Sequence, residues 1–496
     1  MSDMTYDRFD DTYDVVVVGA GISGINMAHH VQSKVPHLRY TILEARNNIG
    51  GTWDLFRYPG IRSDTDLLTF GFEWKPWTEN QAIADGESIA RYLHEAAASE
   101  GIDRHIKFRH RVIAADWVSE SQTWNLIVDA DHTGHVNLRT RFLILGTGYY
   151  DYLKPLQAQI PGLYDNFKGK VVHPQFWPED LDYAGKRIVI VGSGATAITL
   201  LPSLAAKGGL VTMLQRSPTY ILSIDNTTGE SWIHKMLPKS WSSKLSRWTF
   251  MTTTALIYYL CRAFPSLARS ALLGKVTKQL PNHVPVDPHF QPIYRPWDQR
   301  LCFTPDGDFF KCMRESTATV ATGRIKTITE DTIMLESGQR LEADIIVTAT
   351  GLKLDFGGHI HISVDKSPIN VAEKYAWRTS MLQDVPNLAF IMGYVNASWT
   401  LGAETTAQLV CRLLRYMEKM NFSSAVPRLP ASSSFQPQPM WNLDATYVRQ
   451  AEGHMPRCGE TGPWKGRTNY FLDLFRAKHG SLSSGLHFEQ GSKKSQ

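Results

Sequence analysis

One pattern occurs twice in this sequence: a strand rich in β-branched residues, a glycine-rich turn, a helix and a second strand. The first turn is at residues 19–24 (Gly-Ala-Gly-Ile-Ser-Gly) and the second at residues 192–197 (Gly-Ser-Gly-Ala-Thr-Ala). Glycines in such a turn let the backbone approach a pyrophosphate at the N-terminus of the helix. The repeat therefore predicts an α/β protein with two dinucleotide-binding, Rossmann-like domains.

The expected elements follow one another in the same order in both copies. The first copy has a strand, a helix and a second strand at residues 14–18, 25–33 and 40–43, and the second has them at residues 187–191, 198–206 and 210–214. Two further segments, 142–148 and 344–351, are strands that end in glycine, which is typical of strands that close a nucleotide-binding sheet and lead the chain to the next domain. We therefore expect the second domain to be inserted in the first.

This reading divides the chain into six parts. Residues 226–289 have a helical pattern with many aromatic residues and no strand alternation, so we expect a helical subdomain there. The predicted parts are an FAD-type domain (1–150 and 352–480), an NADPH-type domain (151–225 and 290–351), the helical insert (226–289) and a flexible tail (481–496).

Composition excludes several classes of protein. With 496 residues, 43% hydrophobic and 20% charged, the chain can bury normal cores, and its net charge of +4 gives no case for nucleic acid. Its five cysteines form no C-x-x-C pair, which indicates free thiols in a reducing compartment and favours a cytoplasmic protein. The polar N-terminus does not resemble a signal peptide, no stretch is long and apolar enough to span a membrane, and no metal site is predicted. Weak association with a membrane surface through residues 241–273 stays open.

The residue that ends the second strand distinguishes the two cofactors. Glu44 lies 25 positions after Gly19, where a carboxylate accepts hydrogen bonds from ribose hydroxyls and repels a 2′-phosphate. The matching place in the second unit reads Gln215-Arg216-Ser217, with Arg216 24 positions after Gly192, and a guanidinium binds phosphate in a fork. The first site therefore suits FAD or NAD and the second NADPH, unless both side chains are merely solvated strand ends.

Two longer strings carry a family resemblance. Residues 167–178 read Phe-x-Gly-x-x-x-His-x-x-x-Trp-Pro, and residues 50–64 read Gly-Gly-x-Trp, then Tyr-Pro-Gly, then Asp. Both resemble the patterns of Baeyer–Villiger monooxygenases, class B flavoproteins that insert one oxygen atom of O2 beside a ketone carbonyl. Residues 214–220, 296–302 and 393–400 further resemble the ethionamide-activating branch of this family.

The resemblance implies a reaction and its cofactors. FAD reduced by NADPH reacts with O2 to give a C4a-peroxyflavin, which converts an apolar ketone to an ester or lactone and can also oxidise thioethers. The cofactor-binding residues that we infer are Gly19, Gly21, Gly24, Glu44, Gly51, Thr52, Trp53, Asp64 and Trp399 for FAD, and Gly192, Gly194, Thr196, Arg216 and Ser217 for NADPH. Thr196 and the loop around Trp399 have equally plain structural readings, as a residue of the helix N-terminus and as a loop before a helix at 407–419.

The resemblance also implies a catalytic arginine at the flavin. Arg300 and Arg295 both lie beside the Pro-Trp-Asp turn at 296–298, and Arg300 fits better because a hydrophobic strand follows it at once. Asp64 would orient this arginine, although Arg300 could instead pair with Asp298. His173 is expected to act as a hinge that bonds to backbone, with a structural role or proton transfer as alternatives.

Other functions are compatible with parts of the sequence. An S- or N-oxygenating flavin monooxygenase would use the same cofactors, but the Trp-Pro at 177–178 favours the ketone reaction. A disulfide reductase needs a cysteine pair beside the flavin, whereas Cys302 and Cys312 are ten positions apart. A non-catalytic NADPH-binding regulator would not need Trp53 or Asp64.

Overall fold

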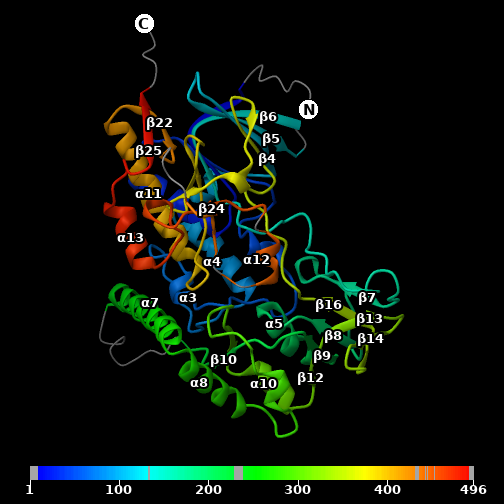
Figure 1. Ribbon diagram of the computed structural model, residues 1–496. Coiled ribbons are helices and arrows are strands. Elements are labelled where there is room, and N and C mark those ends of the chain that lie inside the picture. Colours follow the sequence, from blue (N-terminus) through cyan, green and yellow to red (C-terminus); the bar gives the residue numbers. More distant parts are fainter. Residues whose placement is uncertain are drawn as a thin grey trace.

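The computed structural model describes residues 9–131, 134–227, 238–430, 435–441, 443, 445–451 and 453–490. Within this part of the chain, a mixed eleven-stranded sheet and a parallel five-stranded sheet form the centres of two halves of the molecule (Figure 1). The first part of the predicted helical insert, 228–237, and the last six residues of the predicted tail lie outside the described residues.

The larger sheet belongs to the N-terminal unit. Its central strand β1 (Asp11–Val18) pairs in parallel with β2 (Tyr40–Glu44) on one side and with β6 (Gly134–Leu145) on the other. The order continues to the other strands of this sheet, which are β3 (Ile106–Phe108), β4 (His110–Val118), β5 (Thr123–Ala130), β17 (His361–Val364), β18 (Ser367–Pro368), β19 (Ala376–Trp377), β20 (Met381–Leu382) and β21 (Leu388–Phe390).

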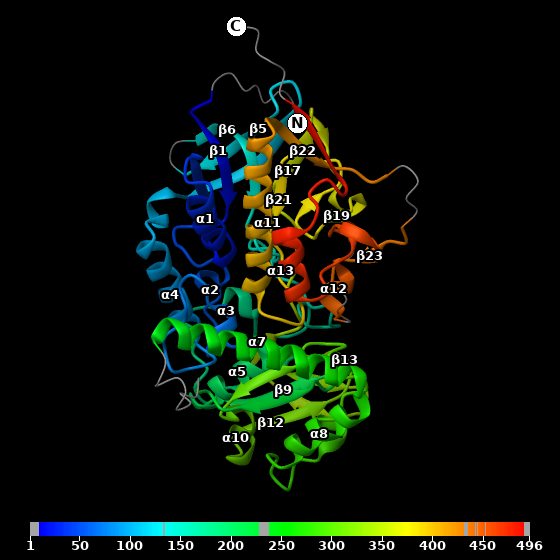
Figure 2. The same cartoon turned by 90° about the vertical axis from the view of Figure 1, so that its left-hand side faces the viewer.

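Strand β1 is buried on both faces, as its run of valines predicts for a parallel strand. Val15 and Val17 belong to one hydrophobic core and Val16 and Val18 to another, because successive side chains of a strand point to opposite faces. Helices α1 (Ile22–Lys34), α4 (Gly86–Ser99) and α11 (Trp399–Lys419) contribute to the first core. Figure 2 shows α1 and α11 next to each other on this side of the sheet.

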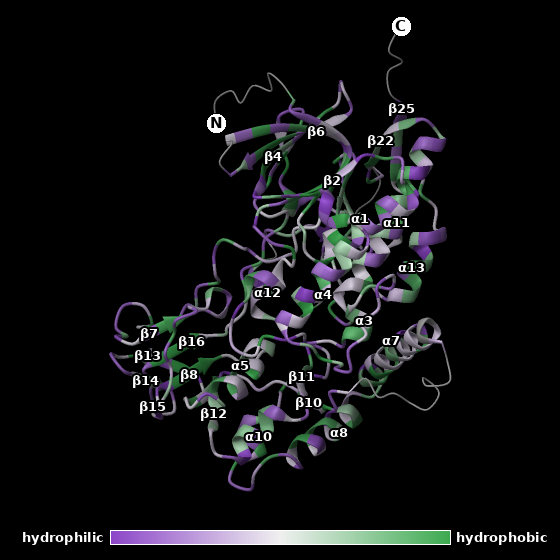
Figure 3. Ribbon diagram, turned by 180° about the vertical axis from the view of Figure 1, so that it is seen from behind, coloured by the Kyte–Doolittle hydropathy of each residue, from purple (hydrophilic) through white to green (hydrophobic). Residues whose placement is uncertain are grey.

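The second unit contains a five-stranded, fully parallel sheet in the order β12-β9-β8-β16-β7. Its strands are β7 (Lys170–Val172), β8 (Arg187–Val191), β9 (Leu210–Gln215), β12 (Ala318–Thr322) and β16 (Ile345–Thr348), and α5 (Ala195–Ala205) connects β8 to β9. Strands β8 and β16 are mainly hydrophobic, apart from Arg187 at the start of β8 and Thr348 at the end of β16 (Figure 3). This confirms the predicted fold class, with the second nucleotide-type unit inserted in the first.

The helical insert consists of three described helices: α7 (Lys239–Ala263), α8 (Pro265–Thr277) and α9 (Val286–His289). A two-stranded parallel sheet of β10 (Ile221–Ile224) and β11 (Cys302–Pro305) closes it at its base. The remaining elements are α2 (Thr52–Leu55), α3 (Leu67–Phe70), α10 (Asp308–Arg314), α12 (Thr446–Gln450), α13 (Tyr470–His479), β13 (Ile325–Ile328), β14 (Thr332–Leu335), β15 (Arg340–Glu342), β22 (Phe422–Pro427), β23 (Gln438–Pro439), β24 (Arg457–Cys458) and β25 (Leu486–Gln490).

Two expectations are corrected. The predicted flexible tail from residue 481 is wrong over Leu486–Gln490, because this segment forms β25 and pairs antiparallel with β22. The ring of Phe488 stacks on Phe422 of β22. The pairing partner of this segment is therefore distant in the sequence, and the Ser- and Gly-rich local sequence gives no sign of it. Helix α11 begins at Trp399, eight residues before the predicted start at 407. All five cysteines are free thiols, as predicted.

Two segments connect the units, and one buried carboxylate joins them. Asp151 of the first segment is fully buried and accepts hydrogen bonds from Lys353 Nζ (2.8 Å) and His359 Nε2 (2.9 Å) of the second. Burial acts to raise the pKa of Asp151, but these contacts and the backbone N–H groups of Leu153 and Lys154 outweigh it and hold the pKa below its usual range. The charged carboxylate of Asp151 therefore links the two connecting segments by hydrogen bonds and an ion pair.

Replacing Asp151 tests how much its contacts contribute to the stability of the fold. Asp151→Asn keeps the shape and removes the charge, and should lower the free energy of unfolding by about 1–3 kcal/mol at neutral pH. Because the folded-state pKa is depressed, the stabilisation is present above the ordinary pKa of aspartate and is lost as the pH falls toward the folded value. Denaturant unfolding of both proteins across the acid range measures this, and a difference that does not shrink with falling pH would contradict it.

Candidate functional site

A cavity of ≈ 490 Å³ lies where the two units meet. The carboxyl ends of β1, β2 and β6 contribute to its wall, which is where open α/β sheets bind ligands. It is lined by residues of both units, among them Gly19, Gly21, Glu44, Gly51, Thr52, Trp53, Tyr58, Asp64, Tyr149, Thr196, Arg300, His359 and Trp399. The structure thus brings most of the sequence-predicted FAD residues and the candidate arginine into one space.

The first glycine turn lines this cavity with backbone. Gly19 has φ +100°, and a Cβ there would lie 2.7 Å from the Gly146 carbonyl oxygen. A Cβ at Gly21 would lie 3.6 Å from Gly51 Cα, in ordinary contact, so these two glycine backbones lie close together in the cavity wall. Gly24 has a packing role instead, since its Cβ would meet the Gly19 carbonyl oxygen at 1.8 Å. Helix α1 has no side-chain cap, which leaves its N-terminal N–H groups for an anion.

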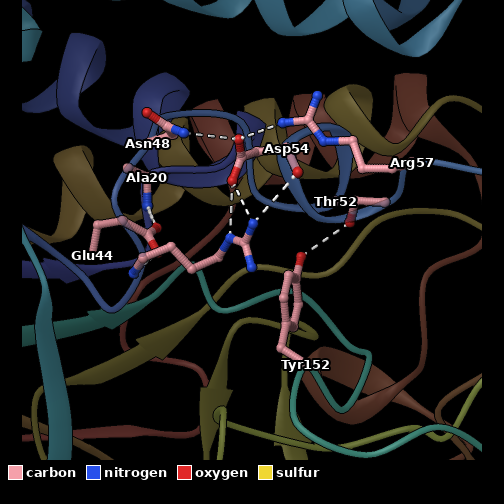
Figure 4. A network of polar contacts seen from close by, with 8 residues as sticks. Ala20, Glu44, Asn48, Thr52, Asp54, Arg57 and Tyr152 are labelled. Carbon is pink, nitrogen blue, oxygen red and sulfur yellow. Dashed lines mark hydrogen bonds and ion pairs between the residues drawn. The ribbon is translucent and has the colours of Figure 1, made fainter. Parts of the chain in front are cut away.

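Glu44 is held in place at the end of β2. Its carboxylate accepts hydrogen bonds from the backbone N–H of Ala20 (2.7 Å) and of Arg46 (2.8 Å), as Figure 4 shows for Ala20. Burial raises the pKa of Glu44 in spite of these two contacts. The side chain therefore lies fixed against the turn, in the cavity wall where the ribose was predicted.

The loop after Glu44 is stabilised by a carboxylate that sequence reasoning missed. Asp54 is buried and accepts hydrogen bonds from Arg46, Asn48 and Arg57 (Figure 4). These contacts fix α2, which carries Thr52 and Trp53. The Thr52 hydroxyl is 3.0 Å from that of Tyr152, and the Trp53 ring contacts Phe70 edge-on.

Arg300 lies in the cavity and pairs with Asp64. Arg300 Nη1 donates to Asp64 Oδ2, and the two side chains are 33% and 36% exposed, on the cavity side of both. The Asp64 charge raises the pKa of the Arg300 guanidinium above its usual range, so that it stays cationic. Asp298, the alternative partner, pairs with Arg262 instead. Arg295 is exposed and is absent from the described cavity wall.

The second glycine turn faces the same cavity through Thr196. Its hydroxyl interacts with that of Tyr58, whose pKa burial raises to about 12. Gly192 has φ +143° and a Cβ there would lie 2.2 Å from the Ala349 carbonyl oxygen, whereas a Cβ at Gly194 would meet open space. Helix α5 has no side-chain cap, as in α1.

Arg216 and Ser217 follow β9 directly beside this turn. Ser193 Oγ donates to the Ser217 carbonyl oxygen (2.9 Å), which parallels the contact of Ala20 with Glu44 in the first unit. Arg216 is exposed and donates to Thr446 Oγ1 (3.4 Å), and no ion pair with a described carboxylate engages it. Its guanidinium is therefore available to a ligand at the position predicted for the 2′-phosphate.

His173 follows β7 and caps the N-terminus of the short 3₁₀ helix Pro174–Phe176. It is absent from the described cavity wall. Its Nδ1 accepts the backbone N–H of Gln175 (3.2 Å), while Nε2 is buried beside the Gly351 backbone without a well-aligned hydrogen bond. Burial lowers its pKa, which favours the neutral ring. Gln175 Nε2 in turn donates to the Asp151 carbonyl oxygen (2.6 Å). The fingerprint string thus contacts both connecting segments.

The segment around Trp399 is a helix start and not a loop. Its indole N–H donates to Ser23 Oγ (2.8 Å), and its ring stacks on Tyr149 at 4.6 Å between centroids. Sequence reasoning missed Tyr149 and its neighbour Tyr150, which line the cavity beside Arg300. Their position immediately after a strand that ends in glycine was the available signal.

The comparisons agree with this architecture. The pattern of the pyridine nucleotide-disulphide oxidoreductase family matches residues 16–234. The chain is 44% identical to the FAD-containing monooxygenase EthA of Mycolicibacterium smegmatis, over 96% of this chain and 97% of that protein. It is 43% identical to the probable FAD-binding monooxygenase AlmA of Acinetobacter baylyi, over 96% of each.

Solved structures of lower identity share the fold. An oxidized steroid monooxygenase bound to NADP superposes with a TM-score of 0.73 at 21% identity, covering 97% of this chain and 100% of that one. A cyclohexanone monooxygenase with epsilon-caprolactone bound gives 0.72 at 20% identity, with the same coverage of 97% and 100%.

Two alanine variants separate the packing glycine from the cavity glycine. Gly24→Ala should destabilise the fold by roughly 1–3 kcal/mol or more, because its Cβ overlaps a backbone oxygen that cannot move aside. Gly21→Ala should change stability by less than about 1 kcal/mol, because its Cβ finds ordinary contact distances. Thermal unfolding of both variants measures this, and equal losses would contradict the assigned roles.

Proposed function

The chain belongs to the family of FAD-containing monooxygenases that includes EthA, and we propose that it uses NADPH and O2 to insert an oxygen atom beside a ketone carbonyl, giving an ester or lactone. The observation that carries this proposal is the Arg300–Asp64 ion pair inside the cavity that both glycine turns face. An arginine that is permanently charged in such a place is suited to holding an anionic oxygen.

The first unit fits FAD. Gly21 and Gly51 line the cavity close together, where the absence of side chains would let a pyrophosphate approach the backbone, and the uncapped N-terminus of α1 adjoins them. Glu44 would bind the ribose, and Thr52, Trp53 and Trp399 would contact the flavin end. Bound FAD would supply the redox chemistry, taking electrons from NADPH and passing them to O2.

The second unit fits NADPH. The open space beside Gly194 and the uncapped N-terminus of α5 would receive the pyrophosphate, and the exposed guanidinium of Arg216 would receive the 2′-phosphate. Thr196 lies between this site and the first unit, against Tyr58, so that the reactive end of the nicotinamide cofactor would enter the shared cavity.

Arg300 and Asp64 would divide the electrostatic work. Arg300 would place two or more N–H donors against the oxyanion that develops on the attacked ketone carbon. Asp64 is a positioning residue, since its contact with Arg300 Nη1 fixes the direction of the fork. We assign His173 the role of a positioning residue as well, because it bonds to backbone next to both connecting segments.

The substrate that we propose is apolar, because aromatic side chains make up much of the cavity wall around Arg300. The test is NADPH consumption by the purified yellow enzyme with linear, cyclic and aryl ketones and one thioether, with products identified. Ester formation supports the proposal, while a sulfoxide as the sole product would favour the S-oxygenating alternative. Gly21→Ala should fold and lose FAD, which tests the flavin site in the same preparation.

Arg300→Ala should separate reduction from oxygenation. We expect this variant to retain FAD and NADPH binding and to lose ester formation by at least about 10²–10³, with hydrogen peroxide released instead. Arg300→Lys should rescue it poorly, because an ammonium lacks the planar fork. The matched control is Arg295→Ala, which removes an exposed arginine five residues away and should form ester normally. The reverse result would place the catalytic arginine at 295.

Arg216→Ala should separate the two nicotinamide coenzymes. Loss of a charged contact of roughly 1.5–3 kcal/mol should raise the KM for NADPH about ten- to hundredfold and leave that for NADH nearly unchanged. Lys207→Ala, which removes an exposed basic residue just after α5, is the control. If the KM for both coenzymes rises equally, Arg216 does not read the 2′-phosphate.

A further inference from the structure

Helix α7 presents an apolar stripe to solvent. Trp241, Leu245, Trp248, Leu256 and Tyr259 are all exposed, with Trp241 at 69% and Leu256 at 58%. Their spacing follows the helical repeat, so they lie along one side of the helix. A row of exposed large apolar side chains is typical of an interaction site in a folded protein.

The opposite side of α7 attaches it to the body of the molecule. Arg247 is buried and its Nη1 donates to the carbonyl oxygens of Leu68 (2.8 Å), Thr69 (3.2 Å) and Gly71 (2.7 Å), at and beyond the C-terminal end of α3. Met251 packs in a small core with Tyr394 and Tyr470. These contacts attach α7 to the rest of the molecule and leave its apolar stripe exposed to solvent.

The apolar surface continues past α7. Trp248 stacks on Phe471 of α13, next to the exposed Leu472 and Phe475. At the other end, Leu267 of α8 is 71% exposed. Figure 2 shows α7 running across the face turned to the viewer, with α13 above it and α8 below.

The charge of this region has one sign. Between positions 231 and 286 the sequence contains no Asp or Glu, and its basic residues are Lys235, Lys239, Lys244, Arg247, Arg262, Arg269, Lys275 and Lys278. Of these, Arg262 pairs with Asp298, whereas Lys244, Lys275 and Lys278 are exposed and form no ion pair with any described carboxylate. Such a surface complements an anionic partner.

We propose that the α7–α8 face docks on the surface of a membrane that contains anionic lipid. Tryptophan and tyrosine with leucine on one side of a helix, flanked by lysines, is the composition of helices that lie in the bilayer interface. No described helix is long and apolar enough to cross a membrane. In the proposed complex α7 would lie in the plane of the membrane surface. A protein partner is less suited, because the exposed lysines meet the uniform negative charge of a lipid surface.

Docking would place the cavity close to a lipid bilayer, in which apolar molecules dissolve. Arg247 ties α7 to α3, and Phe70 of α3 lines the cavity. This part of the inference rests on the proposed function, since it names the substrate class as apolar ketones dissolved in lipid. The binding of the membrane itself does not depend on it.

Vesicle flotation of the holoenzyme tests the docking. Phosphatidylcholine vesicles that include phosphatidylglycerol should carry the protein, vesicles of phosphatidylcholine alone should carry much less, and added salt should release it. The variant Trp241→Ser with Leu245→Ser and Leu256→Ser should lower the bound fraction about tenfold. Lys244→Glu with Lys275→Glu should remove the preference for anionic lipid while leaving the helix apolar stripe intact.

The matched control changes exposed large side chains elsewhere. Tyr164→Ser with Leu210→Thr alters the surface of the second unit and should bind vesicles as the wild type does. All three variants should oxidise NADPH normally with a water-soluble ketone. Only the two variants of the α7–α8 face should be slow with a ketone dissolved in vesicles that contain anionic lipid.

The proposal is overturned if the wild type binds neither kind of vesicle, or if both variants of the α7–α8 face bind anionic vesicles as well as the wild type does. Self-association that the α7 variants abolish, without vesicle binding, overturns it in favour of a second copy of the chain. Vesicle binding without ketone oxidation would leave docking standing and refute the proposed reaction alone.

Discussion

The ion pair between Arg300 and Asp64 is the interaction on which the organisation of the site depends. Asp64 belongs to the N-terminal unit and Arg300 to the inserted one, 236 positions later in the chain. A guanidinium in an apolar, aromatic cavity requires a negative partner, because an unpaired charge there is strongly unfavourable. The pair therefore does two things at once: it supplies a fixed positive charge to the cavity and it sets how the two units meet around that charge.

The same relation between the units is fixed independently at the connecting segments. Asp151 binds Lys353 and His359 across the two segments, and the fingerprint string adds Gln175 and His173 to this junction. The string therefore contacts the junction between the two units and is absent from the described cavity wall. These contacts support the positioning role that we propose for His173.

Local sequence patterns predicted the strands, turns and helices of the two units well, because each of these elements is determined largely by residues that are neighbours in the sequence. The strand Arg187–Val191 was predicted at its observed bounds, and Glu44 in the first unit and Ser217, next to Arg216, in the second contact their glycine turns from matching positions. What could not be predicted depends on distant partners. Helix α11 begins early because Trp399 is held by Ser23 and Tyr149, and β25 exists because β22 pairs with it. The Asp54 network was missed since nothing in a single Asp after Trp53 indicates that two arginines converge on it.

The Tyr-Pro-Gly string shows how a single motif can satisfy two constraints. We interpreted it as part of the flavin site, and Tyr58 does line the cavity. Gly60, however, has φ +75° and lies against α5 of the other unit, where a Cβ would be 1.8 Å from Ser203 Oγ and 3.2 Å from the Thr199 carbonyl oxygen. The glycine is therefore required by the contact between units and by its backbone conformation, with no ligand involved. Since α5 also carries the second glycine turn at its N-terminus, the close approach at Gly60 is what brings Thr196 to Tyr58, and so what lets two separate nucleotide-type units share one cavity.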